Sequence, residues 1–97
     1  MARFDVHAGP KGELMLDCQA DILDHFETRF VVPLLPAQGT LQASRLQPVF
    51  SVEDRKVVMV THLASAVSVK MLKRRVASLD GERTAILNAL DMLIRGC

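Results

Sequence analysis

Residues 80–97 read Asp80-Gly-Glu-Arg-Thr-Ala-Ile-Leu-Asn-Ala-Leu-Asp-Met-Leu-Ile-Arg-Gly-Cys97, and this is the stretch whose pattern predicts a long helix. At about 100° per residue, its apolar side chains fall on one arc, which consists of Ile86, Leu87, Leu90, Leu93, Ile94 and Cys97. Asp91 and Arg95 lie on the outer side, one turn apart, where they can pair. Asp80 is the predicted N-cap, and Gly96 is expected to end the helix. The apolar arc has to be buried, so this helix must dock on the segments before it.

Those earlier segments alternate in the manner of strands. Strands are predicted over residues 3–7, 14–18, 29–34, 48–52 and 57–62, and residues 64–69 could add another. Pro33 cannot donate a ladder hydrogen bond, so its strand is expected at a sheet edge or at a bulge. Residues 57–60 are apolar on both faces, which predicts a central strand with the helix as a cover. The predicted fold class is mainly β with a C-terminal helix.

The bulk properties of the chain limit the classes of protein to consider. Its 97 residues predict one domain, 1–97, and a hydrophobic content of 49% excludes disorder. Twelve basic against eleven acidic residues give a net charge of +1, which carries no overall signal for nucleic acid or membrane. No apolar run approaches the roughly 18 residues of a membrane helix, and the N-terminus lacks a signal-peptide core. A cytoplasmic location is therefore expected.

The residue types that usually carry chemistry are scattered. His7, His25 and His62 have no metal-ligand spacing, so neither a metal nor a cofactor is expected. His7 and His62 fall on polar strand faces and are predicted to lie at the surface. Cys18, within a strand pattern, is predicted to be a small buried residue. Phosphate-binding glycine loops and nucleophile motifs are absent from the sequence, so no enzymatic activity is predicted.

Charge is clustered in two places. One is a basic cluster without any acid, made of Lys70, Lys73, Arg74 and Arg75. The other lies in and around segment 19–28, which is predicted to be a structured loop with a helical turn, anchored by Ile22, Leu23 and Phe26; its acids are Asp17, Asp21, Asp24 and Glu27. Both clusters can be solvated faces. Alternatively, the basic cluster receives an acidic partner segment or nucleic-acid phosphates. The lack of interleaved aromatic residues weighs against single-strand binding.

The order of specific residues resembles the CcdB family of bacterial toxins over nearly the whole chain. The most specific pieces are Asp17-Cys18-Gln19-Ala20-Asp21-Ile22 and Arg29-Phe30-Val31-Val32-Pro33-Leu34, because strand composition alone does not predict them. Further matches are the opening strand, Leu46-Gln47-Pro48-Val49, Met59-Val60-Thr61, and Asn88-Ala89 with Gly96. The resemblance implies a small SH3-like barrel, or a strongly bent antiparallel sheet, with a C-terminal helix and a two-fold homodimer.

The resemblance also implies a function. Members of this family are toxins of type II toxin–antitoxin pairs that bind the A subunit of DNA gyrase and trap the enzyme on cleaved DNA. An antitoxin neutralises them through a disordered tail, and the two proteins together repress their own operon, so DNA is reached only through the antitoxin or gyrase. By position, the target-binding tip is Arg95, Gly96 and Cys97, and an antitoxin-binding role falls to Lys70, Lys73, Arg74 and Arg75.

The tip departs from the family pattern, and this keeps alternatives open. The family places an aromatic residue, which stacks on a gyrase arginine, where this chain has Arg95; only Gly96 matches. The basic run at 70–75 also replaces an acidic, glycine-containing turn. One alternative is a toxin of the same fold with another target, either another topoisomerase or RNA, which the related MazF-type toxins cut. The other is an inactive module that binds the antitoxin and regulates the operon.

Overall fold

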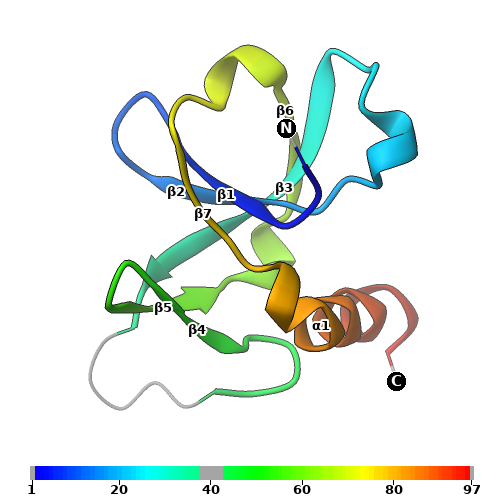
Figure 1. Cartoon of the computed structure of the whole chain (residues 1–97). Helices are drawn as coiled ribbons and strands as arrows, with labels where there is room; N and C mark the ends of the chain where they lie inside the picture. Colours follow the sequence, from blue (N-terminus) through cyan, green and yellow to red (C-terminus); the bar gives the residue numbers. More distant parts are fainter. Residues whose placement is uncertain (1, 38–42, 97) are drawn as a thin grey trace.

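The computed structural model describes residues 2–37 and 43–96, and it contains one curled antiparallel sheet and one α-helix (Figure 1). The strands are β1 (Asp5–Ala8), β2 (Leu14–Asp17), β3 (Thr28–Pro36), β4 (Val49–Val52), β5 (Arg55–Met59), β6 (Ser65–Ser68) and β7 (Arg75–Ser78). The helix α1 spans Arg83–Arg95. Short 3₁₀ turns lie at Asp21–Leu23, Thr61–Leu63, Val69–Met71 and Asp80–Glu82. The prediction of a mainly β fold with a C-terminal helix is confirmed.

The sheet order is β4-β5-β3-β2-β1-β7, and β6 pairs with β3 outside this path. The sheet curls into a half-barrel in which β4 and β7 are the two ends of this order, and β6 is a further edge strand. Strand β5 lies between β4 and β3, and its residues Val57, Val58 and Met59 are all buried, which confirms the predicted central strand. Among the described helices, none is long and apolar enough to cross a membrane.

The prediction that Pro33 marks an edge or a bulge is wrong. Strand β3 is the centre of the sheet, paired along one side with β2 and along the other first with β6 and then with β5. The pairing with β6 ends at Val31 and the pairing with β5 begins at Leu34. Pro33 lies in the gap between these partners, where its missing N–H leaves no ladder bond unmade, while its carbonyl accepts from Val60 N at 3.0 Å.

Two groups of buried side chains cover the two faces of the sheet. The larger core joins the helix residues Ile86, Ala89 and Leu90 to the sheet, and its other members include Phe4, Val32, Phe50, Val57 and Met59. The smaller group lies on the opposite face and consists of Met15, Val31 and Leu72. His7 pairs in register with Met15 and is only 5% exposed, so its predicted surface position is wrong, whereas His62 is exposed as expected. Because β1 lies in the interior of the sheet, the side chains on its polar face are not exposed to water.

Three predictions about the helix and the acidic loop are corrected. The predicted N-cap, Asp80, does not cap α1. The N-cap is Glu82, without a side-chain capping bond, because Asp80 lies in the preceding 3₁₀ turn and instead forms an ion pair with Arg83 at 2.6 Å. Leu93 and Ile94 are exposed, at 40% and 76%, because the last turn runs beyond the sheet (Figure 1). The acidic segment does hold a 3₁₀ turn, but its supposed anchors are exposed, namely Ile22, Leu23 and Phe26.

Candidate functional site

The exposed end of α1 holds the first candidate site. Met92, Leu93 and Ile94 are all partly or largely in water, and Arg95 is 66% exposed. Gly96 takes a left-handed conformation (φ 75°) and its N–H donates to the carbonyl of Met92 at 2.9 Å, so it stops the helix as predicted. Cys97 lies outside the described residues. The predicted tip therefore adjoins exposed apolar residues, of which Leu93 and Ile94 had been predicted to face the core.

The side chain of Arg95 is only loosely held. Its Nη2 lies 3.9 Å from Oδ2 of Asp91, and both side chains are more than half exposed. Such a pair contributes about 0.3–0.5 kcal/mol and is screened by salt. Arg95 therefore remains available to a partner that offers a better acceptor.

The acidic loop before β3 presents a second exposed apolar surface, and residues of the family motif hold it in place. Gln19 donates from Nε2 to the carbonyl of Leu23 at 2.7 Å and accepts the N–H of Phe30 at 2.9 Å. Asp21 accepts the N–H of Arg3 at 2.8 Å. The loop is thus tied to β3 and to the segment before β1, while Ile22 remains 82% exposed. An apolar residue held in water by a bonded scaffold is typical of a contact surface.

Asp17 and Arg29 form a buried ion pair beneath this loop. The Nε–H of Arg29 donates to Oδ2 of Asp17 at 2.9 Å, and Nη2 lies 2.6 Å from the same oxygen. The N–H groups of Nη2 do not point along that line, so this second contact is ionic rather than a second hydrogen bond. Asp17 also accepts the N–H of Gln19 at 3.0 Å. Both side chains are at most 2% exposed, so the pair is a scaffold element and not a binding surface.

The four residues of the predicted basic cluster are all exposed, but their side chains have different surroundings. Lys70 lies in the 3₁₀ turn Val69–Met71, and Lys73 follows it. Arg75 begins β7 and its Nε lies 3.1 Å from Oδ2 of the buried Asp5, so its charge is partly neutralised. Arg74 instead lines a hollow on the other side of the strand. The structure therefore separates Arg74 from its neighbours in sequence.

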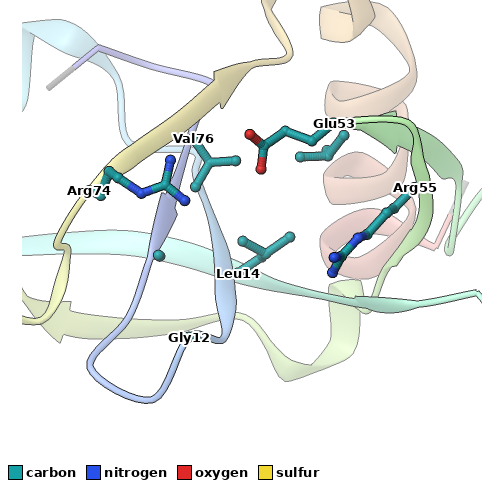
Figure 2. Close-up of a pocket in the computed structure, with 8 residues that line it drawn as sticks. Gly12, Leu14, Glu53, Arg55, Arg74 and Val76 are labelled. Carbon is teal, nitrogen blue, oxygen red and sulfur yellow. The ribbon is translucent and has the colours of Figure 1, made fainter.

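That hollow is shown in Figure 2 and has a volume of about 470 Å³. Arg74 and Val76 come from the β7 side, Glu53 and Arg55 from the β4–β5 hairpin, and Leu14 from β2. Nothing local indicated this site, because its residues come from three hairpins or strands that meet only in the curled sheet.

The part of the chain that the structure describes offers little support for a metal site or for a reactive thiol. No group of three or more His, Cys, Asp or Glu side chains there could hold a metal ion. Cys18 is buried as predicted, and burial, with a smaller contribution from the charge of Asp17, raises its pKa from 9.0 to about 12. A thiol with so high a pKa is protonated at neutral pH and is a poor nucleophile or metal ligand.

Comparison with known proteins agrees with the geometry. In the solved structures, the chain is similar to the Mycobacterium tuberculosis toxin MazF-mt6, with a TM-score of 0.75, 14% sequence identity, and coverage of 93% of this chain and 95% of that chain. At this identity, the similarity establishes the fold. The family model described as CcdB protein matches residues 3–96. The chain therefore belongs to the CcdB family, the toxins of toxin–antitoxin pairs.

Proposed function

We propose that this protein binds the A subunit of DNA gyrase and traps the enzyme on cleaved DNA. The observation that carries the proposal is the family match over residues 3–96, which includes the exposed helix end with Gly96. In this proposal the toxin does no covalent chemistry itself, because gyrase makes the covalent intermediate. The protein acts by binding, and its contact residues are those at the end of α1.

Arg95 sets the expected strength of that binding. By resemblance, an aromatic residue at this position stacks on a gyrase arginine, and Arg95 would place a second guanidinium against it. Two like charges in contact are unfavourable, and the apolar contact area of an aromatic anchor is lost. The weak pair with Asp91 does not remove the charge. We therefore expect weak trapping of a gyrase that carries this arginine.

The test is a gyrase cleavage-trapping assay with the wild type and Arg95→Trp. The substitution should increase trapped, cleaved DNA, because it restores an aromatic anchor and removes the like charge. Arg83→Trp is the matched control, since Arg83 is an equally exposed arginine at the opposite end of the same helix. Equal trapping by the wild type and Arg95→Trp would show that position 95 is not the anchor. No trapping by either protein, with growth inhibition retained in cells, would favour another target.

The same proposal includes the partners of the family. The protein forms a homodimer, is neutralised by an antitoxin, and represses its operon together with that antitoxin. The family match and the gain in stability that a small chain obtains by association support the dimer. Analytical ultracentrifugation across a dilution series should show a dimer that dissociates on dilution; a monomer at all concentrations would contradict it.

A further inference from the structure

The hollow of Figure 2 lies where the half-barrel stays open. Strands β4 and β7 are the two ends of the main strand order, and Val52 of β4 and Val76 of β7 line the hollow together. The pairing of β7 with β1 shifts register here, since Val6 pairs with Ala77 but His7 pairs with Arg75. Val76 is the extra residue of this bulge. Bulges often redirect side chains next to binding sites, and this one lies at the wall of the hollow.

The charges around the hollow have no partners of their own. Arg55, Arg74 and Glu53 make no ion pair and no side-chain hydrogen bond with the described part of the chain. Their stems stand over apolar side chains, including Leu14 and Val76 (Figure 2). Two guanidinium groups above an apolar floor suit a carboxylate on an aliphatic stem, which gains charge-assisted hydrogen bonds and buries its methylenes.

A smaller hollow of about 180 Å³ extends the site along the protein. It shares Gly12, Leu14 and Arg55 with the first hollow, and its further lining is mainly apolar, including Leu34, Leu35, Pro36 and Val57. Leu35 is 48% exposed, which is high for a leucine in a central strand. We name the two hollows together the seam groove. Arg74 lies at one end of it and Arg55 lines both hollows. At the other end the apolar lining around Leu35 is flanked by Glu13 and Lys56.

The hairpin that forms one wall of the seam groove is strained. Glu53 and Asp54 have φ values of 51° and 64°, a left-handed conformation that favours glycine or asparagine. These are the two turn residues between the paired Val52 and Arg55, so the hairpin has a turn with positive φ at both positions but without glycine or asparagine. The conformation brings the carboxylate of Glu53 to the rim of the hollow, opposite Arg74 (Figure 2). There it can accept N–H groups from the backbone of a bound segment.

We propose that the seam groove binds an extended, acidic segment of the antitoxin, with a carboxylate between Arg55 and Arg74 and an apolar side chain at Leu35. The inference rests on the proposed function, since the family supplies the antitoxin as partner. Charge complementarity argues for this occupant. Glu53 limits how many negative groups the hollow can accept, which favours a single carboxylate over the successive phosphates of a nucleic-acid backbone. The proposal replaces the four-residue basic cluster by Arg74 together with Arg55, which is distant in sequence.

The test measures peptide binding to the full-length protein by fluorescence anisotropy. The probe is a labelled synthetic peptide rich in glutamate and leucine, and its counterpart carries glutamine in place of glutamate. Arg55→Ala and Arg74→Ala should each weaken binding of the acidic peptide about tenfold, as expected for lost charge-assisted bonds. Glu53→Gln should strengthen it. The glutamine peptide should bind the wild type weakly and respond little to any of these substitutions.

Lys70→Ala and Lys73→Ala are the matched controls, because each removes one exposed positive charge outside the groove. They should change the affinity less than twofold. Equal weakening by these controls, or unchanged affinity in Arg55→Ala and Arg74→Ala, would overturn the inference. So would an oligonucleotide that displaces the acidic peptide in the wild type but not in Arg74→Ala. As a second measurement, the arginine Nε–H NMR signals of Arg55 and Arg74 should shift on peptide addition.

The gyrase assay separates this inference from the proposed function. A protein that binds the acidic peptide through Arg55 and Arg74, yet fails to trap gyrase even as Arg95→Trp, would retain the seam groove and lose the proposed target. Trapping of gyrase together with unaltered peptide binding in Arg74→Ala would retain the proposed target and overturn the seam groove. Urea denaturation of each variant checks the fold, which should be unaffected because both arginines are exposed.

Discussion

Arg29→Met should be among the most destabilising single substitutions in the protein. Arg29 is 1% exposed and provides both the Nε hydrogen bond and the closest positive charge to Asp17, which is fully buried. Methionine replaces the stem but not the guanidinium. Asp17 would then be a buried carboxylate with one remaining hydrogen bond, from the N–H of Gln19.

Removing one partner of a buried ion pair costs about 3–5 kcal/mol, because the other charge stays desolvated and uncompensated. Small domains are stable by only about 5–15 kcal/mol, so this loss approaches the whole stability at the lower end. Replacing both partners is less harmful, since no isolated charge remains. We therefore expect Asp17→Leu with Arg29→Met to cost clearly less than the sum of the two single substitutions.

The assay is urea denaturation followed by circular dichroism, with the two single variants and the double variant forming a mutant cycle. Arg83→Met is the matched control, because it also removes an arginine from an ion pair, but an exposed one. With the loss of its cation–π contact on Phe4, 5.6 Å from the ring centroid, it should cost about 1 kcal/mol. The reasoning is refuted if Arg29→Met costs no more than Arg83→Met, or if the double variant costs the full sum.

Two further predictions concern the helix and the buried thiol. Leu90→Ala should lower the free energy of unfolding by about 2–5 kcal/mol, because Leu90 packs in the main core. Asp80→Ala should cost less than about 0.5 kcal/mol, because Asp80 forms an exposed ion pair and not a helix cap. Both changes are measured from denaturation midpoints. Stability should fall as the pH rises from 9.0, the ordinary pKa of the thiol, towards about 12, its raised pKa in the folded chain. Over this range the unfolded chain loses the Cys18 proton that the folded chain retains. In denaturation measured against pH, Cys18→Ala in a Cys97→Ser background should lack this part of the decline.

The local elements could be predicted from the sequence, and the errors occurred where distant segments decide. Alternation along a strand shows which side chains share a face, but not which strands pair with it. It does not show that β3 changes partner between Val31 and Leu34, which is why Pro33 was misplaced. His7 was misplaced for a related reason. Its polar character suggested a wet face, but β2 and β7 flank its strand, and its Nδ1 lies 3.4 Å from the carbonyl of Lys73.

The candidate sites were less accessible to sequence reasoning than the fold. The apolar arc of α1 has the same period throughout, so periodicity cannot tell that Ile86 reaches the core while Ile94 lies in water. The difference depends on where the sheet ends. Likewise Arg55 and Arg74 are nineteen positions apart, and only the curl of the sheet brings them to one hollow.

The motif that identifies this family consists largely of scaffold residues. Asp17 and Arg29 are buried against each other, and Gln19 is bonded to the backbone on both sides. Such residues are fixed by the demands of the fold, so they are informative about architecture and carry little information about the target. Under the proposed function, target choice depends instead on the exposed helix end with Arg95, where a substitution costs the fold almost nothing. A chain can therefore retain the family fold while the charge at its helix end changes which surface it binds.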